Sequence, residues 1–382
     1  MTSGNPPSAA AGADLSNWRT SPYSRWAFRN VGQLIATEVV ENDPANVSSL
    51  RHARNGKSES MLRTLFLKAT ATDAFVMLSD GEIVYECYSN GNDAATPHIL
   101  MSATKSVVGL ITGLLEARGA IDLGFPVARY VPESAGTAYA NATLRQLLDM
   151  RSGVVLNEVD EIAYNRASGW NPVSSGEPAQ GLHAFFASLT SLPAAHGGDF
   201  RYVSANTDLL AWAIERAAGK SLASLLSEEL WVPMGAERPA FITVDRKGAP
   251  RATGGLCATA RDFARVGQLL VDGGHSGSRQ VLPPSLIEDI ERGGDADAWA
   301  RGEWGKAFAP ISKTMRYRSG WYVVEDEPQH IFAMGIHGQN LFVDRANRIV
   351  IAKFSSWAQP TDYINLPATH IAVRRLQRSK AG

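Results

Sequence analysis

Strand-like segments lie near both ends of the ordered part of this chain, and helical segments lie between them. Residues 74–78 and 82–88 flank a Ser-Asp-Gly turn, a pattern that predicts a β-hairpin. Strand patterns return late in the chain, at 320–324, 340–343 and 349–352. Segments so far apart can share one sheet when the chain between them forms a unit of its own. The sequence therefore predicts an α/β domain assembled from both ends, with a helical domain inserted into it.

The expected domain boundaries follow from this division of the chain into strand-like ends and a helical middle. We expect residues 1–19, rich in Ser, Pro, Gly and Ala, to form a disordered tail. Residues 20–121 and 273–382 are expected to form the α/β domain, and residues 122–272 the mainly helical domain. A length of 382 residues is enough for two domains. A cleft between two domains is a common place for a site, so we expect the active site there.

Composition and charge exclude several classes of protein. The 37 basic and 38 acidic residues give a net charge of −1, which predicts no binding of nucleic acid or of an anionic membrane. Two cysteines, Cys87 and Cys257, are too few and too far apart for a disulfide framework or a cysteine metal site. The eight histidines show no paired ligand spacing, so we expect neither a metal nor another cofactor. No basic start precedes an apolar run at the N-terminus, so we expect a cytoplasmic protein.

A nucleophile candidate lies at the start of a predicted helix over 102–118. Ser102 and Lys105 are three residues apart, a spacing that puts both side chains on one face of a helix. A serine hydroxyl is a weak nucleophile near neutral pH and needs a base, which a lysine of lowered pKa can supply. The alternative is structural: an N-cap serine followed by a solvated lysine.

Two later segments add to this candidate. The first, 200–207, leads into a predicted helix and contains Tyr202, whose phenol could pass a proton between nucleophile and leaving group. The second, 254–267, is a glycine loop followed by the cap residue Thr259 and an amphipathic helix. Each also has a structural interpretation, as a capped helix start and as scaffolding.

These segments, in this order, resemble the serine β-lactamase-like family, which holds class C β-lactamases, DD-peptidases and related esterases. The resemblance spans about residues 25–357. It implies the class C β-lactamase/DD-peptidase-like fold, an antiparallel sheet flanked by helices with an inserted helical domain. It further implies that Ser102 is the acylated nucleophile and that Lys105 and Tyr202 form its proton relay. The oxyanion would be bound by the backbone N–H groups of Ser102 and Met334.

On residues 25–28, 101–106, 202–208, 335–340 and 355–357, the chain resembles one group within this family, the hydrolases of 6-aminohexanoate (nylon) oligomers. In that group an Asp binds the free amino end of the substrate, and the matching position here is Asn165, with Tyr164 as a stand-in for a second binding residue. An Asn offers no negative charge to an ammonium group. We also expect Trp170, Ser204 and His337 to contact substrate, although Trp170 and His337 have core interpretations too.

The main expectation is therefore a serine carboxylesterase that acts on short-chain esters through an acyl-enzyme. An alkoxide leaves more readily than an amine, so ester cleavage is the less demanding reaction. One alternative is an amide hydrolase of 6-aminohexanoate oligomers, and another is a binding protein that keeps the fold without catalysis. An α/β-hydrolase is disfavoured because the chain has no Gly-x-Ser-x-Gly elbow. The expected partner is a small ester or amide substrate, with a homodimer as a possibility.

Overall fold

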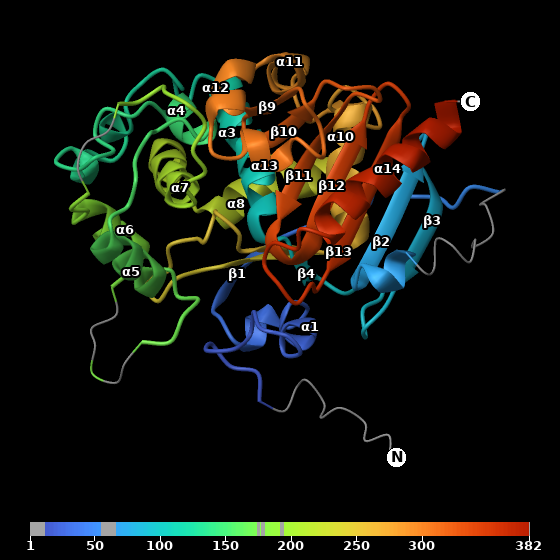
Figure 1. Cartoon of the computed structure of the whole chain (residues 1–382), viewed down its shortest axis with the longest axis horizontal. Helices are drawn as coiled ribbons and strands as arrows, with labels where there is room; N and C mark the ends of the chain where they lie inside the picture. The colour runs from blue at the N-terminus through green and yellow to red at the C-terminus, as the bar shows by residue number, and fades with distance from the viewer. Residues whose placement is uncertain (1–11, 55–65, 174–175, 177–179, 192–194, 382) are drawn as a thin grey trace.

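A seven-stranded antiparallel sheet forms the centre of the computed structural model, which describes residues 12–54, 66–173, 176, 180–191 and 195–381 (Figure 1). Its strand order is β3-β2-β13-β12-β11-β10-β9. The strands are β2 (Thr72–Ser79), β3 (Glu82–Tyr88), β9 (Met315–Arg318), β10 (Trp321–Val324), β11 (His330–Gly335), β12 (Gln339–Asp344) and β13 (Ile349–Ser355). The predicted hairpin and late strands are thus present.

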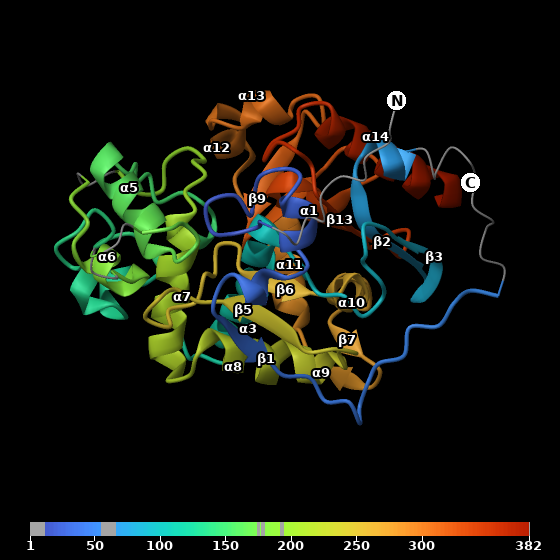
Figure 2. The same ribbon diagram turned by 90° about the horizontal axis from the view of Figure 1, so that it is seen from below.

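Both ends of the chain contribute to this one sheet. The early strand β2 pairs with the last strand β13, and Phe75 lies opposite Lys353 in the register. Alternating side chains of these strands point to opposite faces, so each face needs its own cover of apolar residues. Helix α10 (Ala260–Val271) and helix α14 (Asn365–Ala381) lie on opposite faces of the sheet (Figure 2).

Helix α10 lies outside the region where the sequence boundaries put it. We expected residues 122–272 to form the helical domain, but α10 packs directly on β13, β12 and β2. Gly267 explains the close approach, because an added Cβ would lie 3.2 Å from the side chains of Leu341 and Val343. The helical pattern of α10 was readable from the sequence, whereas its packing partner was not.

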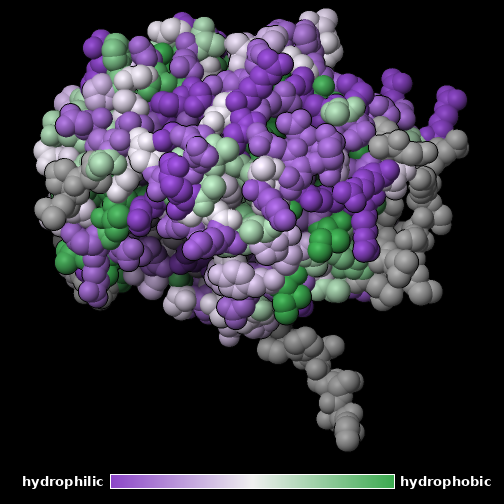
Figure 3. All heavy atoms as spheres, turned by 45° about the horizontal axis from the view of Figure 1, so that its top comes forward, coloured by the Kyte–Doolittle hydropathy of each residue, from purple (hydrophilic) through white to green (hydrophobic). Residues whose placement is uncertain are grey.

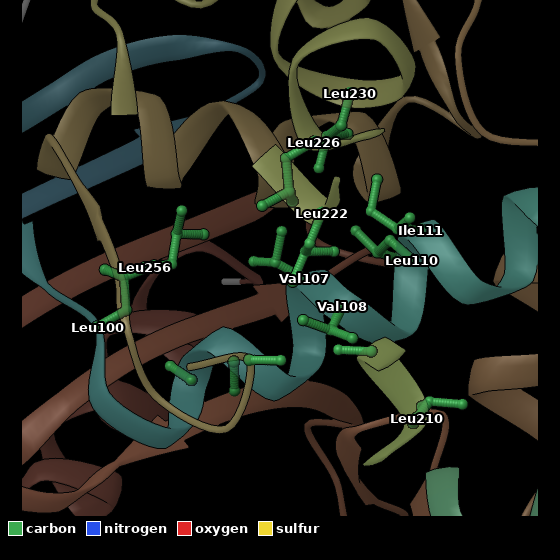
Figure 4. Close-up of a cluster of buried hydrophobic side chains, with 14 of the residues drawn as sticks. Leu100, Val107, Val108, Leu110, Ile111, Leu210, Leu222, Leu226, Leu230 and Leu256 are labelled. Carbon is green, nitrogen blue, oxygen red and sulfur yellow. The ribbon is translucent and has the colours of Figure 1, made fainter. Parts of the chain in front are cut away.

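Helix α3 (Thr104–Ala117) joins the sheet to the helical region. Its buried side chains Val107, Val108, Leu110 and Ile111 lie among leucines from helices α7 and α8 (Figure 4). At Gly109 an added Cβ would overlap the carbonyl oxygen of Ser319, so the helix packs against backbone at the start of β10. Contacts on both sides fix α3, and with it the turn at its N-terminus.

The helical region lies to one side of the large sheet in both ribbon views (Figures 1 and 2). Thr143 begins α4 with a capping box, in which its side chain and that of Gln146 each bond the other's backbone N–H. The remaining helices are α1 (Ser24–Ala27), α4 (Leu144–Leu148), α5 (Glu158–Ala167), α6 (Leu182–Ala187), α7 (Ala205–Ala218), α8 (Leu222–Leu226), α9 (Val232–Met234), α11 (Pro284–Arg292), α12 (Ala296–Arg301) and α13 (Gly305–Phe308).

A second, four-stranded antiparallel sheet has the order β1-β5-β6-β4. It contains β1 (Thr37–Val40), β4 (His98–Ile99), β5 (Ala240–Thr243) and β6 (Leu256–Ala258), and a two-stranded ribbon of β7 (His275–Ser276) and β8 (Arg279–Gln280) lies apart from it. Strand β4 runs straight into the turn that carries Ser102. The glycine loop before β6 therefore lies beside the nucleophile candidate.

The segment before residue 20 corrects an expectation. We predicted a disordered tail over 1–19; residues 1–11 lie outside the described part, but residues 12–19 pack on the domain. Trp18 is 1% exposed, and its indole N–H donates to the carbonyl of Trp170 at 3.0 Å. Its ring meets those of Trp170 and Phe28 edge-on. Burial of a large aromatic outweighs the polar composition around it.

Hydrophilic side chains predominate on the face shown in Figure 3, and hydrophobic ones form small separate patches. Among the residues that the structure describes, no helix is both long and apolar enough to cross a membrane.

Candidate active site

Ser102 lies in a 3₁₀ turn, Met101–Ala103, that leads directly into α3. Met101 has a φ of 47°, a conformation that costs a non-glycine residue about 1–3 kcal/mol and needs support from its surroundings. Two glycines give that support by close approach. A Cβ on Gly335 would lie 2.9 Å from the Ser102 nitrogen, and one on Gly254 would lie 3.3 Å from the Met101 carbonyl carbon.

Lys105 is one helical turn beyond Ser102 and faces it. Its Nζ donates to Ser102 Oγ at 3.0 Å and to the carbonyl of Thr253 at 2.7 Å. The side chain is 2% exposed. Burial holds the pKa of Lys105 well below its usual range, Asp208 opposes this shift, and Arg251 adds to it. The structural alternative, a solvated Lys105, is therefore wrong, and the neutral amine forms at lower pH than in a free lysine.

Tyr202 approaches the same hydroxyl from the loop before α7. Its side chain is hydrogen-bonded to Ser102, and its ring centroid is 4.9 Å from Lys105 Nζ. The ring stacks on Trp304 at 4.3 Å, and the Tyr202 backbone N–H donates to Glu303 Oε1 at 2.8 Å. Burial raises the pKa of the Tyr202 phenol, with the Ser102 hydrogen bond acting in the opposite direction. The phenol thus keeps its proton well above neutral pH.

A pocket of about 540 Å³ opens on these residues. Apart from Ser102 and Tyr202, its walls are largely aromatic and aliphatic. They consist of Trp304, Tyr322, Met334, Gly335, Ile336, Asn340, Trp357, Pro360, Thr361 and Leu366. Such a lining, with few polar groups close to a nucleophile, is typical of a site for a small molecule with an apolar part.

Met334, expected to give the second oxyanion donor, lies on β11 and lines this pocket beside Gly335. The end of β11 passes next to the Ser102 nitrogen, as the close approach of Gly335 shows. Strand end and nucleophile turn are therefore neighbours, as an oxyanion hole of two backbone donors requires. The choice of Met334 as the donor stays a prediction.

A second pocket, of about 820 Å³, is also lined by Tyr202. It contains three of the residues expected to bind substrate, Asn165, Tyr164 and Ser204. Asn165 is exposed, on α5, and Ser204 is half-buried at the start of α7. Glu161, one turn before Asn165, lines the same pocket.

Tyr164 has partners of its own inside the protein. Its hydroxyl donates to Asp208 Oδ2 at 2.6 Å and accepts from Arg251 Nη1 at 2.6 Å. The side chain is buried, so only part of it faces the second pocket. A phenol with both hydrogen-bonding roles filled is not free to bind an ammonium group.

The other two expected binding residues, Trp170 and His337, are buried and form hydrogen bonds within the protein. Trp170 is buried, and its indole N–H donates to Thr243 Oγ1 at 3.0 Å. His337 is buried, its Nδ1 lies 2.7 Å from the carbonyl of Trp357, and its ring meets Phe28. His337 lines a separate pocket with Trp18 and Arg19. Both Trp170 and His337 therefore have the environment of core residues, which is the alternative that the sequence indicated for each.

No sequence pattern indicated several residues of the site. Trp304, Tyr322 and Leu366 come from elements that follow the helical region, and only the sheet brings them to Ser102. Asp208 and Arg251, which flank Lys105, lie 43 residues apart in the chain. A spacing rule acts over one or two turns and cannot find such pairs.

The fold and the serine–lysine–tyrosine arrangement define a class of protein, and comparison with known families agrees. The family model for beta-lactamase matches residues 66–374, so the chain belongs to the β-lactamase family and is a hydrolase of that family.

Individual proteins of known sequence or structure show which members of this family the chain is similar to. The chain is 38% identical over 365 residues to the 6-aminohexanoate-dimer hydrolase of Paenarthrobacter ureafaciens, covering 93% of this chain and 91% of that protein. A solved structure from Bacillus anthracis, assigned as a 6-aminohexanoate-dimer hydrolase, superimposes with a TM-score of 0.85 at 28% identity and 99% coverage of both chains. A family VIII carboxylesterase shares the fold, with a TM-score of 0.60 at 18% identity, covering 85% of this chain and 99% of that one. The β-lactamase-like fold expected from the sequence is thereby confirmed.

Proposed function

We propose that this hydrolase cleaves short-chain carboxylic esters through an acyl-enzyme on Ser102. One observation carries the proposal: Ser102 Oγ lies 3.0 Å from the buried Nζ of Lys105 and is hydrogen-bonded to Tyr202, at the mouth of an apolar pocket. A nucleophile within hydrogen-bonding reach of a base is the arrangement that acyl transfer requires.

Lys105 serves as the base in this proposal. Its lowered pKa leaves the neutral amine available to take the Ser102 proton as Oγ attacks the ester carbonyl. Tyr202 keeps its own proton, because its pKa is raised, and donates it to the departing alkoxide. Lys105 then passes its proton to Tyr202, so both groups return to their starting state. In the second half of the reaction, water attacks the acyl carbonyl and loses a proton to Tyr202 and Lys105. Ser102 Oγ takes a proton from Lys105 as it leaves.

Ester rather than amide cleavage is supported by the surroundings. Trp304, Tyr322 and Leu366 offer an apolar wall for a short acyl chain. Asn165, in the second pocket, has no charge to hold an ammonium group.

A second candidate function is hydrolysis of the 6-aminohexanoate linear dimer. The 38% identity to an enzyme of that name favours it. Glu161 also favours it, because this carboxylate lines the second pocket beside Asn165 and could hold a substrate ammonium in place of an Asp at 165.

The test is kcat/KM on p-nitrophenyl butyrate and on the linear dimer, measured in parallel. Ser102→Ala should abolish turnover of both. Ser188→Ala should leave it unchanged, because the Ser188 hydroxyl at the end of α6 bonds carbonyls of its own helix. Efficient ester turnover with little release of 6-aminohexanoate supports the main proposal. Efficient dimer turnover that falls in Glu161→Gln supports the second candidate. Ester hydrolysis that survives in Ser102→Ala contradicts both.

A further inference from the structure

A buried charged cluster lies directly behind Lys105. Asp208 on α7 and Arg251 in the loop before β6 form an ion pair, with exposures of 0% and 7% for their side chains. Tyr164 completes the cluster through its hydrogen bonds with both residues. Ion pairs buried this deeply are costly to desolvate, so their presence beside a catalytic group calls for a functional explanation.

Thr253 connects the cluster to Lys105. Its backbone N–H donates to Asp208 Oδ1 at 2.9 Å, and its carbonyl accepts from Lys105 Nζ at 2.7 Å. Asp208 thus fixes the residue whose carbonyl holds the lysine in line with Ser102. None of these bonds reaches the pocket that opens on Ser102.

The cluster also sets the charge around Lys105. The Asp208 carboxylate raises the pKa of Lys105 and the Arg251 guanidinium lowers it. The other polar groups facing the amine are the Ser102 hydroxyl, the Thr253 carbonyl and the ring of Tyr202. The nearby end of β11, residues 334–336, brings no charged side chain. Because the two charges act on Lys105 in opposite directions, removing either one exposes the other.

We propose that the Asp208–Arg251 pair positions the catalytic lysine: it anchors the Thr253 carbonyl that holds Lys105, and it places two opposite charges beside that amine. This inference rests on the proposed function, in which Lys105 takes the Ser102 proton. Asp208 and Arg251 are positioning residues, since neither touches the reacting atoms.

The test measures how the rate of Ser102 labelling by a fluorophosphonate depends on pH, using the full chain. Labelling requires neutral Lys105, so the rate rises with pH through the lysine's titration. Asp208→Asn removes an attraction for the ammonium form and should move this rise to lower pH. Arg251→Gln removes a repulsion and should move it to higher pH. The double variant should return it towards the wild-type position. If the pair had only a structural role, both single variants would label more slowly at every pH. The pH of the rise would then not move in opposite directions in the two variants.

Controls keep the outcome decisive. Arg251→Lys retains the charge and should keep the rise close to its wild-type position. Circular dichroism shows which variants are folded, since breaking a buried pair costs about 3–5 kcal/mol. If a single variant is unfolded, Tyr164→Phe replaces it. Loss of a donor to Asp208 leaves more of its charge to act on Lys105, and the rise should move to higher pH. Folded variants with the wild-type profile, or displaced against the direction expected for each, overturn the inference. A wild-type protein that does not label at all overturns the proposed function instead.

Discussion

The proposed ester hydrolysis depends most on one residue, Lys105. It is buried, hydrogen-bonded to Ser102 Oγ, and its pKa is lowered by desolvation. A lysine in water would be protonated at neutral pH and could not act as a base. In the proposed mechanism, the same helix turn therefore supplies both nucleophile and base.

The first prediction concerns the pH dependence of kcat/KM. The acid limb should lie well below the pH at which a free lysine titrates, because activity is lost only when falling pH protonates Lys105. The basic limb should lie above the titration of a free tyrosine, because the pKa of Tyr202 is raised. Lys105→Met should lower kcat/KM by about 10²-fold or more at every pH. A wild-type acid limb that lies at the pKa of a free lysine would contradict this.

Tyr202→Phe tests the hydroxyl group of Tyr202 separately from its aromatic ring. The ring should still stack on Trp304, so the fold and KM should change little. Loss of the proton donor should lower kcat by about 10²-fold, measured on an ester with a poor leaving group. An activated ester such as a p-nitrophenyl ester should be less affected, since its leaving group needs no proton. Equal losses on both esters would argue against a donor role.

Residue by residue, the sequence predicted the local part of the site and missed the distant part. Ser102 and Lys105 are one turn apart, and helical spacing alone brings them together. Tyr202 came from the family resemblance. Asp208 and Arg251 meet only in the folded chain, so no pattern along the sequence could pair them.

At the scale of elements, helix α3 depends on close approach to the start of β10. Gly109→Ala would place a Cβ on the carbonyl oxygen of Ser319, in a region without room to adjust. We expect a loss in the free energy of unfolding of about 1–3 kcal/mol or more, measured by urea denaturation. Gly136→Ala is the matched control, because an added Cβ there meets no atom of the described residues within 4 Å. Equal stability of the two variants would show that α3 has more room than the structure indicates.

The predicted elements show the same division between local and distant information. The hairpin of β2 and β3 was readable because its alternation and its turn lie within one short stretch. Strands β4 and β6 have two and three residues, too short for any alternation to be visible. Helix α10 was predicted as a helix but assigned to the wrong region, because its amphipathic pattern shows that one face is buried and not against what.

Across the whole molecule, the N-terminal segment packs beneath the site. Trp18 and Phe28 lie in one cluster with Met101, the neighbour of Ser102, and with Trp170. The composition of the segment suggested a tail, since Ser, Pro, Gly and Ala surround a single large aromatic. Two of its partners, Met101 and Trp170, are supplied by distant parts of the chain.

Trp18→Ala tests this attachment. Removing a fully buried Trp should lower the free energy of unfolding by about 3–5 kcal/mol. Tyr363→Ala is the control, because Tyr363 is among the most exposed hydrophobic residues of the described chain and should be neutral. Urea denaturation measures both. A Trp18→Ala protein as stable as the control would contradict the packing of residues 12–19.

The most direct test of the account is whether the acyl group is carried on Ser102. The enzyme would be mixed with p-nitrophenyl butyrate, quenched in acid within the first turnover, digested and analysed by mass spectrometry. We predict one butyryl group on the peptide that contains Ser102, and none on that peptide from Ser102→Ala. Ester turnover with no acyl group on Ser102, or with one on another residue, would contradict the central claim.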